Sequence, residues 1–246
     1  MAKKASVGSK FLVIDLPVGP YAKIKSRERA EDMAIKFIEV GKKLGIKVEV
    51  LITNGSDPSG RAFGPALEAR YAMEILEGKF FDSLAQKSCE LAGALLELTG
   101  SVPKGKGFEK AVDTLASGQA LSKMKEIIRE QGGKIFSSEE IGFAPLKKDV
   151  LSESAGDIHS MNVNLLNNIA RTAGAPANKK AGVMLLAEPG DKVRKGQALM
   201  TIYAENPMKL EAAYALAATS EVFAFKSIIL QKLGRKVPRI LPAQRG

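Results

Sequence analysis

The sequence has one cysteine, one histidine and no tryptophan in 246 residues. A disulfide framework needs at least two cysteines, so a disulfide-stapled fold is excluded, and the single Cys89 is typical of a reducing compartment. No apolar run approaches the roughly 18 residues of a membrane span. The apolar run 11–16 is short and contains Asp15, so it is no secretory signal. We therefore expect a cytoplasmic protein without a membrane segment.

Aromatic residues are also scarce, at 6%, whereas the net charge is +10. A basic balance indicates an anionic partner, either a nucleic acid, a membrane surface or a phosphorylated substrate. The lysines are scattered, few aromatic side chains are available to stack bases, and no nucleic-acid motif occurs. We expect a solvated basic surface without a nucleic-acid partner. A small phosphorylated ligand is kept as an alternative.

The first part of the chain predicts a parallel pair of strands. The run 11–17 is a buried-type strand, Ser26 can cap the helix that follows, and 46–52 alternates as a second strand. A strand, helix and strand with short links favour parallel pairing. Ligands of such sheets bind beyond the carboxyl ends of the strands, which here are 15–20 and 53–61.

After these strands the sequence predicts four helices and then a region of different composition. Short strand-like pieces broken by glycine, proline and serine follow Gly133. The fold class expected is α/β: part of a parallel-sheet α/β domain with several helices, followed by a small α+β barrel-like domain. The expected helices are 65–77, one capped by Asp82, 108–116, 120–131, 163–172 and 210–218, and the expected short strands are 135–136, 141–143 and 157–160. The expected domains are 1–149 and 150–236, with a basic tail at 237–246.

The segment 174–205 predicts a compact module of turns and short strands. Its apolar runs, 182–186 and 199–203, suit strands of a small curved sheet, and Gly190 and Gly196 mark the turns. The pattern G-D-x-V-x-x-G-x-x-L resembles the half-barrel that precedes the modified lysine of biotinyl domains.

Lys209 is the residue that a carrier would modify, but its spacing argues against this role. Biotinyl domains place the lysine about seven positions after the leucine of the module, whereas Lys209 follows Leu199 by ten. The residues after Lys209 are helical in character, and a hairpin lysine needs a strand on both sides. We expect Lys209 to be unmodified.

Three other side chains, and the turn before one of them, each allow a functional and a structural interpretation. His159 could act in acid–base catalysis, but it lacks partners at ligand spacing apart from Asp157, which favours a structural role. Cys89 lies in an amphipathic helix and is expected to pack. Glu68 follows a helix start, where the helix dipole favours acids. The turn 53–64 below that helix could bind an anion, although it has no G-x-x-x-x-G-K-[ST].

Three motifs together indicate more about the fold and function than the amino-acid composition does. They are VIDLPVG at 13–19, ITNGSDPSGRAFGPALEA at 52–69, and the module 174–205. In this order they resemble the type II nucleoside phosphorylase family, which includes thymidine, pyrimidine nucleoside and archaeal AMP phosphorylases, and the similarity is greatest to the branch that acts on AMP. Members have a helical domain, an α/β domain and a small C-terminal barrel-like domain.

The resemblance covers essentially the whole chain but only the last half of the family. The glycine-rich Lys-x-Ser/Thr phosphate loop is absent, and members run to well over 400 residues. The resemblance therefore implies a fragment, a truncated gene product or a split subunit, incomplete and inactive by itself.

One substrate contact is implied at Lys3. Family members have a helix ending in Ser-Ile-x-Ala-Lys-Lys, and Met1-Ala2-Lys3-Lys4 is similar to its end, so the resemblance assigns Lys3 to the base or nucleotide. Bacterial members also bind a monovalent cation through the loop matching Ser59 and Ala62, with a glutamate where this chain has Tyr71. That departure puts the cation in doubt, and we expect no metal.

The activity that the resemblance implies is phosphorolysis of AMP to adenine and ribose 1,5-bisphosphate. Phosphate is the co-substrate, so no cofactor is expected. The expected partners are nucleotide or nucleoside and phosphate, with a homo-oligomer or association with the missing N-terminal half. The alternatives are a thymidine (pyrimidine nucleoside) phosphorylase and a non-catalytic binding module.

Overall fold

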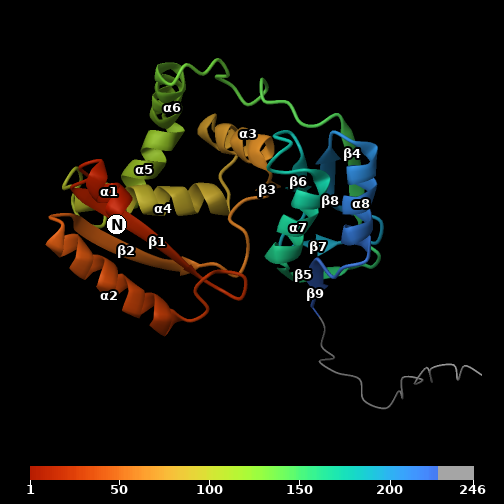
Figure 1. Ribbon diagram of the computed structural model, residues 1–246, viewed down its shortest axis with the longest axis horizontal. Coiled ribbons are helices and arrows are strands. Elements are labelled where there is room, and N and C mark those ends of the chain that lie inside the picture. The colour runs from red at the N-terminus through yellow and green to blue at the C-terminus, as the bar shows by residue number, and fades with distance from the viewer. Residues whose placement is uncertain (227–246) are drawn as a thin grey trace, which may run out of the picture.

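The computed structural model describes residues 1–226, arranged as two parts side by side (Figure 1). The first part holds a pair of strands and most of the helices, and the second holds the two larger sheets. The tail expected at 237–246, and the end of the second domain at 227–236, lie outside the described residues. No helix within the described range is long and apolar enough to cross a membrane.

The predicted parallel pair is confirmed. Strands β1 (Phe11–Val18) and β2 (Lys47–Asn54) run parallel in unbroken register, with Phe11 opposite Lys47. The connecting helix is α2 (Arg27–Lys43), and the Ser26 side chain accepts the N–H of Arg29 at 3.4 Å, which caps the helix as expected.

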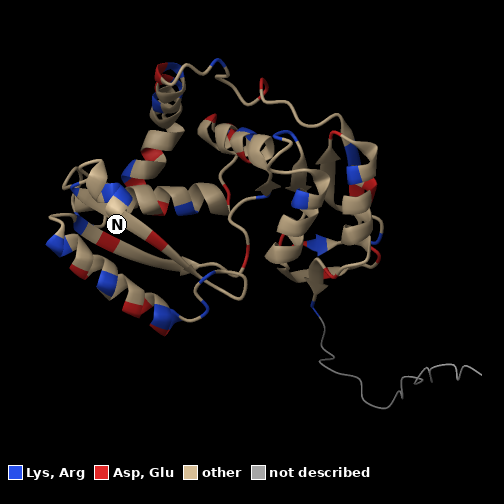
Figure 2. Ribbon diagram, in the orientation of Figure 1, with Lys and Arg blue, Asp and Glu red and all other residues tan. Residues whose placement is uncertain are grey.

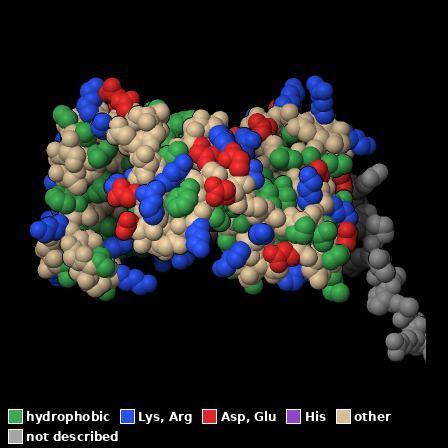
Figure 3. All heavy atoms as spheres, turned by 90° about the horizontal axis from the view of Figure 1, so that it is seen from above, with side chains coloured by type: hydrophobic (Ala, Val, Ile, Leu, Met, Phe, Trp, Pro, Cys, Tyr) green, Lys and Arg blue, Asp and Glu red, His purple; other side chains and the backbone are tan. Residues whose placement is uncertain are grey.

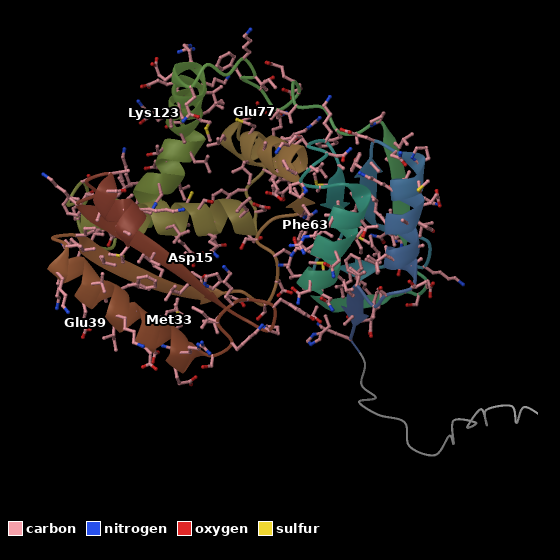
Figure 4. All side chains as sticks on the ribbon, in the orientation of Figure 1. Asp15, Met33, Glu39, Phe63, Glu77 and Lys123 are labelled. Atoms are coloured by element: carbon pink, nitrogen blue, oxygen red, sulfur yellow. The ribbon has the colours of Figure 1, made fainter. Side chains whose placement is uncertain are left out.

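The two faces of this pair are covered by different helices. Leu16 of β1 packs with Ile24 and Ala30, and Met33 and Phe37 of α2 close over this small core. Figure 4 shows Met33 on α2 below the strands. Lys and Arg alternate with Asp and Glu along the outer side of α2 (Figure 2), as expected of a solvated amphipathic helix.

The four helices predicted after the strands are present. Asp82 caps one of them by accepting the N–H groups of Leu84 and Ala85 at 3.1 and 3.0 Å, as predicted. Another begins with proline at its first position, where the missing N–H costs nothing. The helices are α3 (Pro65–Leu76), α4 (Ser83–Leu98), α5 (Gly107–Ala116) and α6 (Gln119–Glu130), and the short α1 (Ala2–Ser6) precedes β1.

The strands predicted at 135–136 and 141–143 are wrong. These residues belong to an irregular connection between α6 and the second part. The backbone N–H and hydroxyl of Ser138 both donate to the Glu77 carboxylate, at 2.8 and 2.6 Å. Within the predicted strands, the Phe136 N–H donates to the Glu140 carboxylate at 3.3 Å and the Ile141 N–H donates to the Ser138 carbonyl at 3.1 Å. Local contacts thus satisfy groups that a strand would have paired with a neighbour.

The second part is α+β, as predicted, with two open sheets. One sheet has the order β3-β6-β8-β4 and the other β7-β5-β9, and within residues 1–226 neither closes into a barrel. Their apolar faces and two helices enclose the largest core, which includes the fully buried Ile158, Leu166 and Ile202. The elements are β3 (Ala62–Phe63), β4 (Leu146–Leu151), β5 (Gly156–Met161), α7 (Val163–Ala173), β6 (Gly182–Leu185), β7 (Lys192–Val193), β8 (Ala198–Ala204), α8 (Pro207–Ala218) and β9 (Phe223–Phe225).

Strand β3 joins the two parts. It leaves the first part and pairs antiparallel with β6, so that Phe63 lies opposite Val183. Gly182 makes this approach possible, because a Cβ there would lie 2.0 Å from the Phe63 carbonyl oxygen. Strand β4 begins at Leu146, close to the boundary expected near Asp149.

We predict that Gly182→Ala lowers the free energy of unfolding by about 3 kcal/mol or more, because the added methyl collides with fixed backbone. Gly190→Ala is the matched control. Gly190 also has a positive φ, of 99°, but its Cβ would meet no atom within 4 Å, so only backbone strain of about 1 kcal/mol is expected. Urea unfolding measures the loss of stability in both variants. Equal losses would contradict the close approach of Gly182 to the Phe63 carbonyl.

Candidate functional site at the carboxyl end of the parallel strands

The loops that follow β1 and β2 touch one another at the edge where the sequence predicts ligand binding. Gly55 donates its N–H to the Val18 carbonyl at 2.8 Å. Gly19 lies so close to Gly55 that a Cβ on Gly19 would be 2.4 Å from the Gly55 carbonyl. Small residues therefore let the two loops form one continuous edge beyond the strands, which is where parallel sheets bind ligands.

A hydrogen-bonded ion pair lies just inside this edge. Thr53 of β2 donates its hydroxyl to Oδ1 of Asp15 at 2.6 Å, and Nζ of Lys87 lies 2.8 Å from Oδ2. Figure 4 labels Asp15 on β1. The side chains of Lys87 and Asp15 are 21% and 27% exposed, so water screens this pair less than a surface pair. The cluster links β1, β2 and α4.

A cavity of about 420 Å³ opens over this cluster, between the first part and the module. Its volume falls within the range of small-molecule sites. Helix α4 supplies a polar wall and the loop after β2 supplies the floor. The module (174–205) together with Met161 of β5 supplies an apolar wall with one carboxylate. The lining residues are Thr53, Asn54, Asp57, Pro58, Ser59, Gly60, Ser83, Gln86, Lys87, Glu90, Met161, Leu185, Glu188 and Pro189.

The charges around the cavity are unequal. Asp57, Glu90 and Glu188 contribute three carboxylates, and Lys87 is the single ammonium in the lining. Asp15 pairs with Lys87 from behind. This arrangement is better suited to sugar hydroxyls or to a group that develops positive charge than to a free phosphate.

Asp57 is the unusual carboxylate of the cavity. Among the described residues, its Oδ1 is the only buried side-chain oxygen or nitrogen without a hydrogen-bond partner. Burial raises the pKa of Asp57, and the positive form of nearby His159 offsets part of that effect. His159 itself is exposed on β5. The structure thus brings His159 close to the cavity floor, a neighbour that its sequence position did not reveal.

The wall that the module contributes is held by Arg61. Its guanidinium forms two contacts with Glu188, at 2.9 and 3.3 Å, and the hydrogen bond from Arg61 to this carboxylate raises the pKa of Arg61. The Arg61 carbonyl also accepts the N–H of Leu185 at 2.8 Å. These contacts fix Glu188 and Leu185 in the cavity wall.

The sequence matches known proteins along nearly its whole length. Residues 158–223 match the pyrimidine nucleoside phosphorylase C-terminal domain. The chain is 43% identical over 236 residues to the AMP phosphorylase of Pyrococcus horikoshii, 44% over 237 residues to that of Methanocaldococcus jannaschii, and 41% over 236 residues to that of Methanosarcina barkeri. The chain is thus similar to the type II nucleoside phosphorylases along nearly its whole length. The matches cover 95–96% of this chain and 46–47% of each relative, so the chain spans about half the length of these relatives.

The structure places the predicted substrate contact, Lys3, away from the cavity. Lys3 is exposed on α1, which lies at the amino end of β1 (Figure 1), and the cavity lies at the carboxyl end. Eight strand residues separate the two ends by about 25 Å. Lys3 and the cavity lining are therefore not brought together, and the role of Lys3 stays a prediction.

Tyr71, at the position where the resemblance implies a cation-binding glutamate in bacterial members, is buried. The Tyr71 hydroxyl donates to Oδ2 of Asp82 at 2.5 Å, and burial raises its pKa. Tyr71 thus joins α3 to the cap of α4. Within residues 1–226, no cluster of three or more His, Cys, Asp or Glu side chains could hold a metal ion.

Three further residues have structural contacts. Glu68 accepts the N–H of Gly64 at 2.8 Å and so caps its own helix. Cys89 is buried in α4. Lys209 lies in the first turn of α8, where Nζ donates to Asn178 at 3.2 Å, and this helix replaces the hairpin that a carrier lysine requires.

We predict a coupling free energy of about 1–2 kcal/mol between Asp15 and Lys87 in a double-mutant cycle of Asp15→Asn and Lys87→Met, measured by urea unfolding. The pair is mostly shielded from water, whereas Lys106 and Glu109 are 64% and 65% exposed. The same cycle at Lys106 and Glu109 is the control, with an expected coupling below about 0.5 kcal/mol. A coupling between Asp15 and Lys87 no larger than that of the control pair would show that the two side chains do not stabilise the fold together.

We predict that Asp57→Asn stabilises the fold more at pH 7 than at pH 3.5. The folded-state pKa of Asp57 is raised, so stability from this group is present below its unfolded pKa of about 3.9 and is lost as pH rises through the folded pKa. Asparagine never carries the charge and avoids this loss. Unfolding free energies at both pH values test the prediction, with the exposed Asp32→Asn as control.

Proposed function

We propose that this chain forms part of a nucleotide phosphorylase that converts AMP and phosphate to adenine and ribose 1,5-bisphosphate in nucleotide salvage or degradation, acting in the cytoplasm without a cofactor. The observation that carries the proposal is the match to AMP phosphorylases over 236 residues. It is supported by a cavity of about 420 Å³ at the edge where parallel sheets bind ligands.

The reaction breaks the bond between the anomeric carbon and the base and forms a bond from that carbon to a phosphate oxygen. The base departs with the electron pair and gains a proton. Positive charge develops on the sugar in the transition state, and the carboxylates of Asp57 and Glu90 in the cavity lining are suited to stabilise it, whereas Glu188 is paired with Arg61. Phosphate binding falls to residues outside this cavity, since the sequence lacks the Lys-x-Ser/Thr loop of the family.

The module acts in this proposal as one wall of the cleft. The Arg61–Glu188 pair and the β3–β6 pairing hold it against the loop after β2. A wall in this position helps to exclude water and to keep the substrate aligned with the attacking oxygen.

A pyrimidine nucleoside substrate is the second candidate. It is favoured by the match of residues 158–223 to the pyrimidine nucleoside phosphorylase C-terminal domain. The third is a non-catalytic binding module.

One assay separates the three candidates. The purified chain is incubated with phosphate and either AMP or thymidine, alone and mixed with the part of the Pyrococcus horikoshii AMP phosphorylase that lies outside its match to this chain, and released base is measured by chromatography. We expect adenine release in the mixture only. Thymine release would favour the second candidate, and no release of either base from a formed complex would favour the third.

Within that mixture, we expect Lys87→Met to lower kcat/KM at least tenfold, because it removes the only ammonium in the cavity lining and frees Asp15. Lys106→Met, far more exposed at 64%, is the matched control and should leave the rate unchanged. The corresponding change Lys3→Met tests the family contact separately. Unchanged turnover in Lys87→Met would place the site elsewhere.

A further inference from the structure

His159 is the only histidine of the chain, and it occupies a β-bulge in β5. Between Ile158 and Ser160 the strand β5 advances by two residues while its partner β9 advances by one, so His159 is the extra residue. Ile158 and Met161 are both buried, although an unbroken strand would put them on opposite faces. The bulge thus leaves His159 exposed, in the way that bulges near binding sites re-aim a side chain.

The backbone around His159 belongs to the wall of the cavity. The turn 188–191 bonds to Ile158 twice, because it donates the N–H of Gly190 and accepts the Ile158 N–H, each at 2.9 Å. The beginning of that turn and Met161, two residues after His159, line the cavity. His159 is therefore held beside the cavity from both directions along the chain.

Asp57, in the loop after β2, supplies an acceptor that lacks a donor. Among the described residues its Oδ1 is buried without a hydrogen-bond partner, which destabilises a fold. Burial raises the pKa of Asp57, and the positive form of His159 acts in the opposite direction. Because the interaction of two charges weakens with distance, this effect indicates that the two side chains are neighbours across the two parts of the molecule.

The other cations beside the cavity are already paired. Lys87 lies 2.8 Å from Asp15, and Arg61 lies 2.9 Å from Glu188. Glu90 of α4 also lines the cavity and adds a charge of the same sign as the unpartnered carboxylate. Across the face shown in Figure 3, basic and acidic side chains are interspersed at the surface, with no single large patch of either sign. That leaves the imidazole of β5, when it is protonated, to neutralise the unpartnered carboxylate.

The sheet of β5 carries charges of both signs around this imidazole. Asp157 lies opposite Lys192 of β7, and the Lys226 N–H donates to the Asp157 carbonyl at 2.8 Å. The Asp191 carboxylate accepts the Glu188 N–H at 2.9 Å. Two acids and two bases thus belong to the sheet and its turn, so the sheet itself adds no net charge beside the imidazole.

We propose that His159 is a positioning residue of the cavity: its protonated imidazole donates a hydrogen bond to the Asp57 carboxylate and so joins β5 to the loop after β2. This contact supplies the missing donor and holds Asp57 ionised and oriented at the cavity floor. It needs a charged donor and a charged acceptor, so it forms at about pH 5.5 and weakens as the pH rises above about 7. The inference rests on the proposed function only in taking the cavity as the substrate site.

The test is NMR of the full chain at about pH 5.5, where a single histidine makes the imidazole signals unambiguous. We expect an imidazole N–H proton that exchanges with water at least about tenfold more slowly than in free histidine, and we expect Asp57→Asn to remove most of this protection. Asp157→Asn, which removes the neighbouring carboxylate on β5, is the matched control and should keep it. Exchange as fast as in free histidine, or equal protection in Asp57→Asn, would overturn the proposal.

The pKa of Asp57, followed through its carboxyl ¹³C signal, tests the same contact from the other side. We expect His159→Gln to raise the pKa of Asp57 by at least about 0.5, a threefold change in its ionisation constant, whereas His159→Arg keeps a positive charge and should restore the native value. Lys192→Met removes an exposed cation from the adjacent strand, and its expected effect is below about 0.2.

An equal rise in Lys192→Met and His159→Gln would show a general field of the sheet instead of a contact, and would overturn the proposal. No substrate enters either measurement, so a negative result here is distinguishable from a negative result in the AMP assay. His159 is exposed, so its replacement leaves the core intact, and the exchange measurement on the native chain needs no variant.

Discussion

The approach of β3 to β6 is the constraint on which the rest of the structure depends. Two residues of the first part, Ala62 and Phe63, enter the four-stranded sheet of the second, and Gly182 permits the backbones to meet. The loop that precedes β3 is thereby held beneath the module, and the cavity is the space that remains between them. A larger residue at Gly182 would separate the two parts. The cavity would then change, although every side chain in its lining stayed the same.

The chemistry of the site depends on which of its charged side chains already have an ion-pair or hydrogen-bond partner. Asp15 is committed to Thr53 and Lys87, and Glu188 is committed to Arg61. Asp57 has no such partner for Oδ1, and its pKa is raised by burial. A carboxylate left unpaired at the floor of a cavity is costly to fold, and sites that bind or react with ligands are where such costs are concentrated.

Local signals in the sequence predicted the elements well. Ser26 and Asp82 marked helix starts, and the alternation after Gly45 marked a strand, because caps and periodicity act over a few residues. The strands expected at 135–136 and 141–143 are absent, because Phe136 and Ile141 donate their N–H groups to nearby residues, Glu140 and Ser138, instead of to a neighbouring strand. Strand β4 was missed because half of its sequence, Leu-Lys-Lys-Asp-Val-Leu, is charged, and it becomes a strand only when β8 supplies its hydrogen bonds.

The sequence by itself determined the resemblance to the family, the parallel pair and the edge of the sheet at which a ligand is expected. Those features depend on motif order, periodicity and glycine placement, which are local. Only the tertiary structure decided that Lys87 of α4 meets Asp15, that His159 lies near Asp57, and that Lys3 lies at the far end of β1. Contacts between residues far apart in sequence depend on how elements pack, and no local pattern encodes which side chains packing brings together.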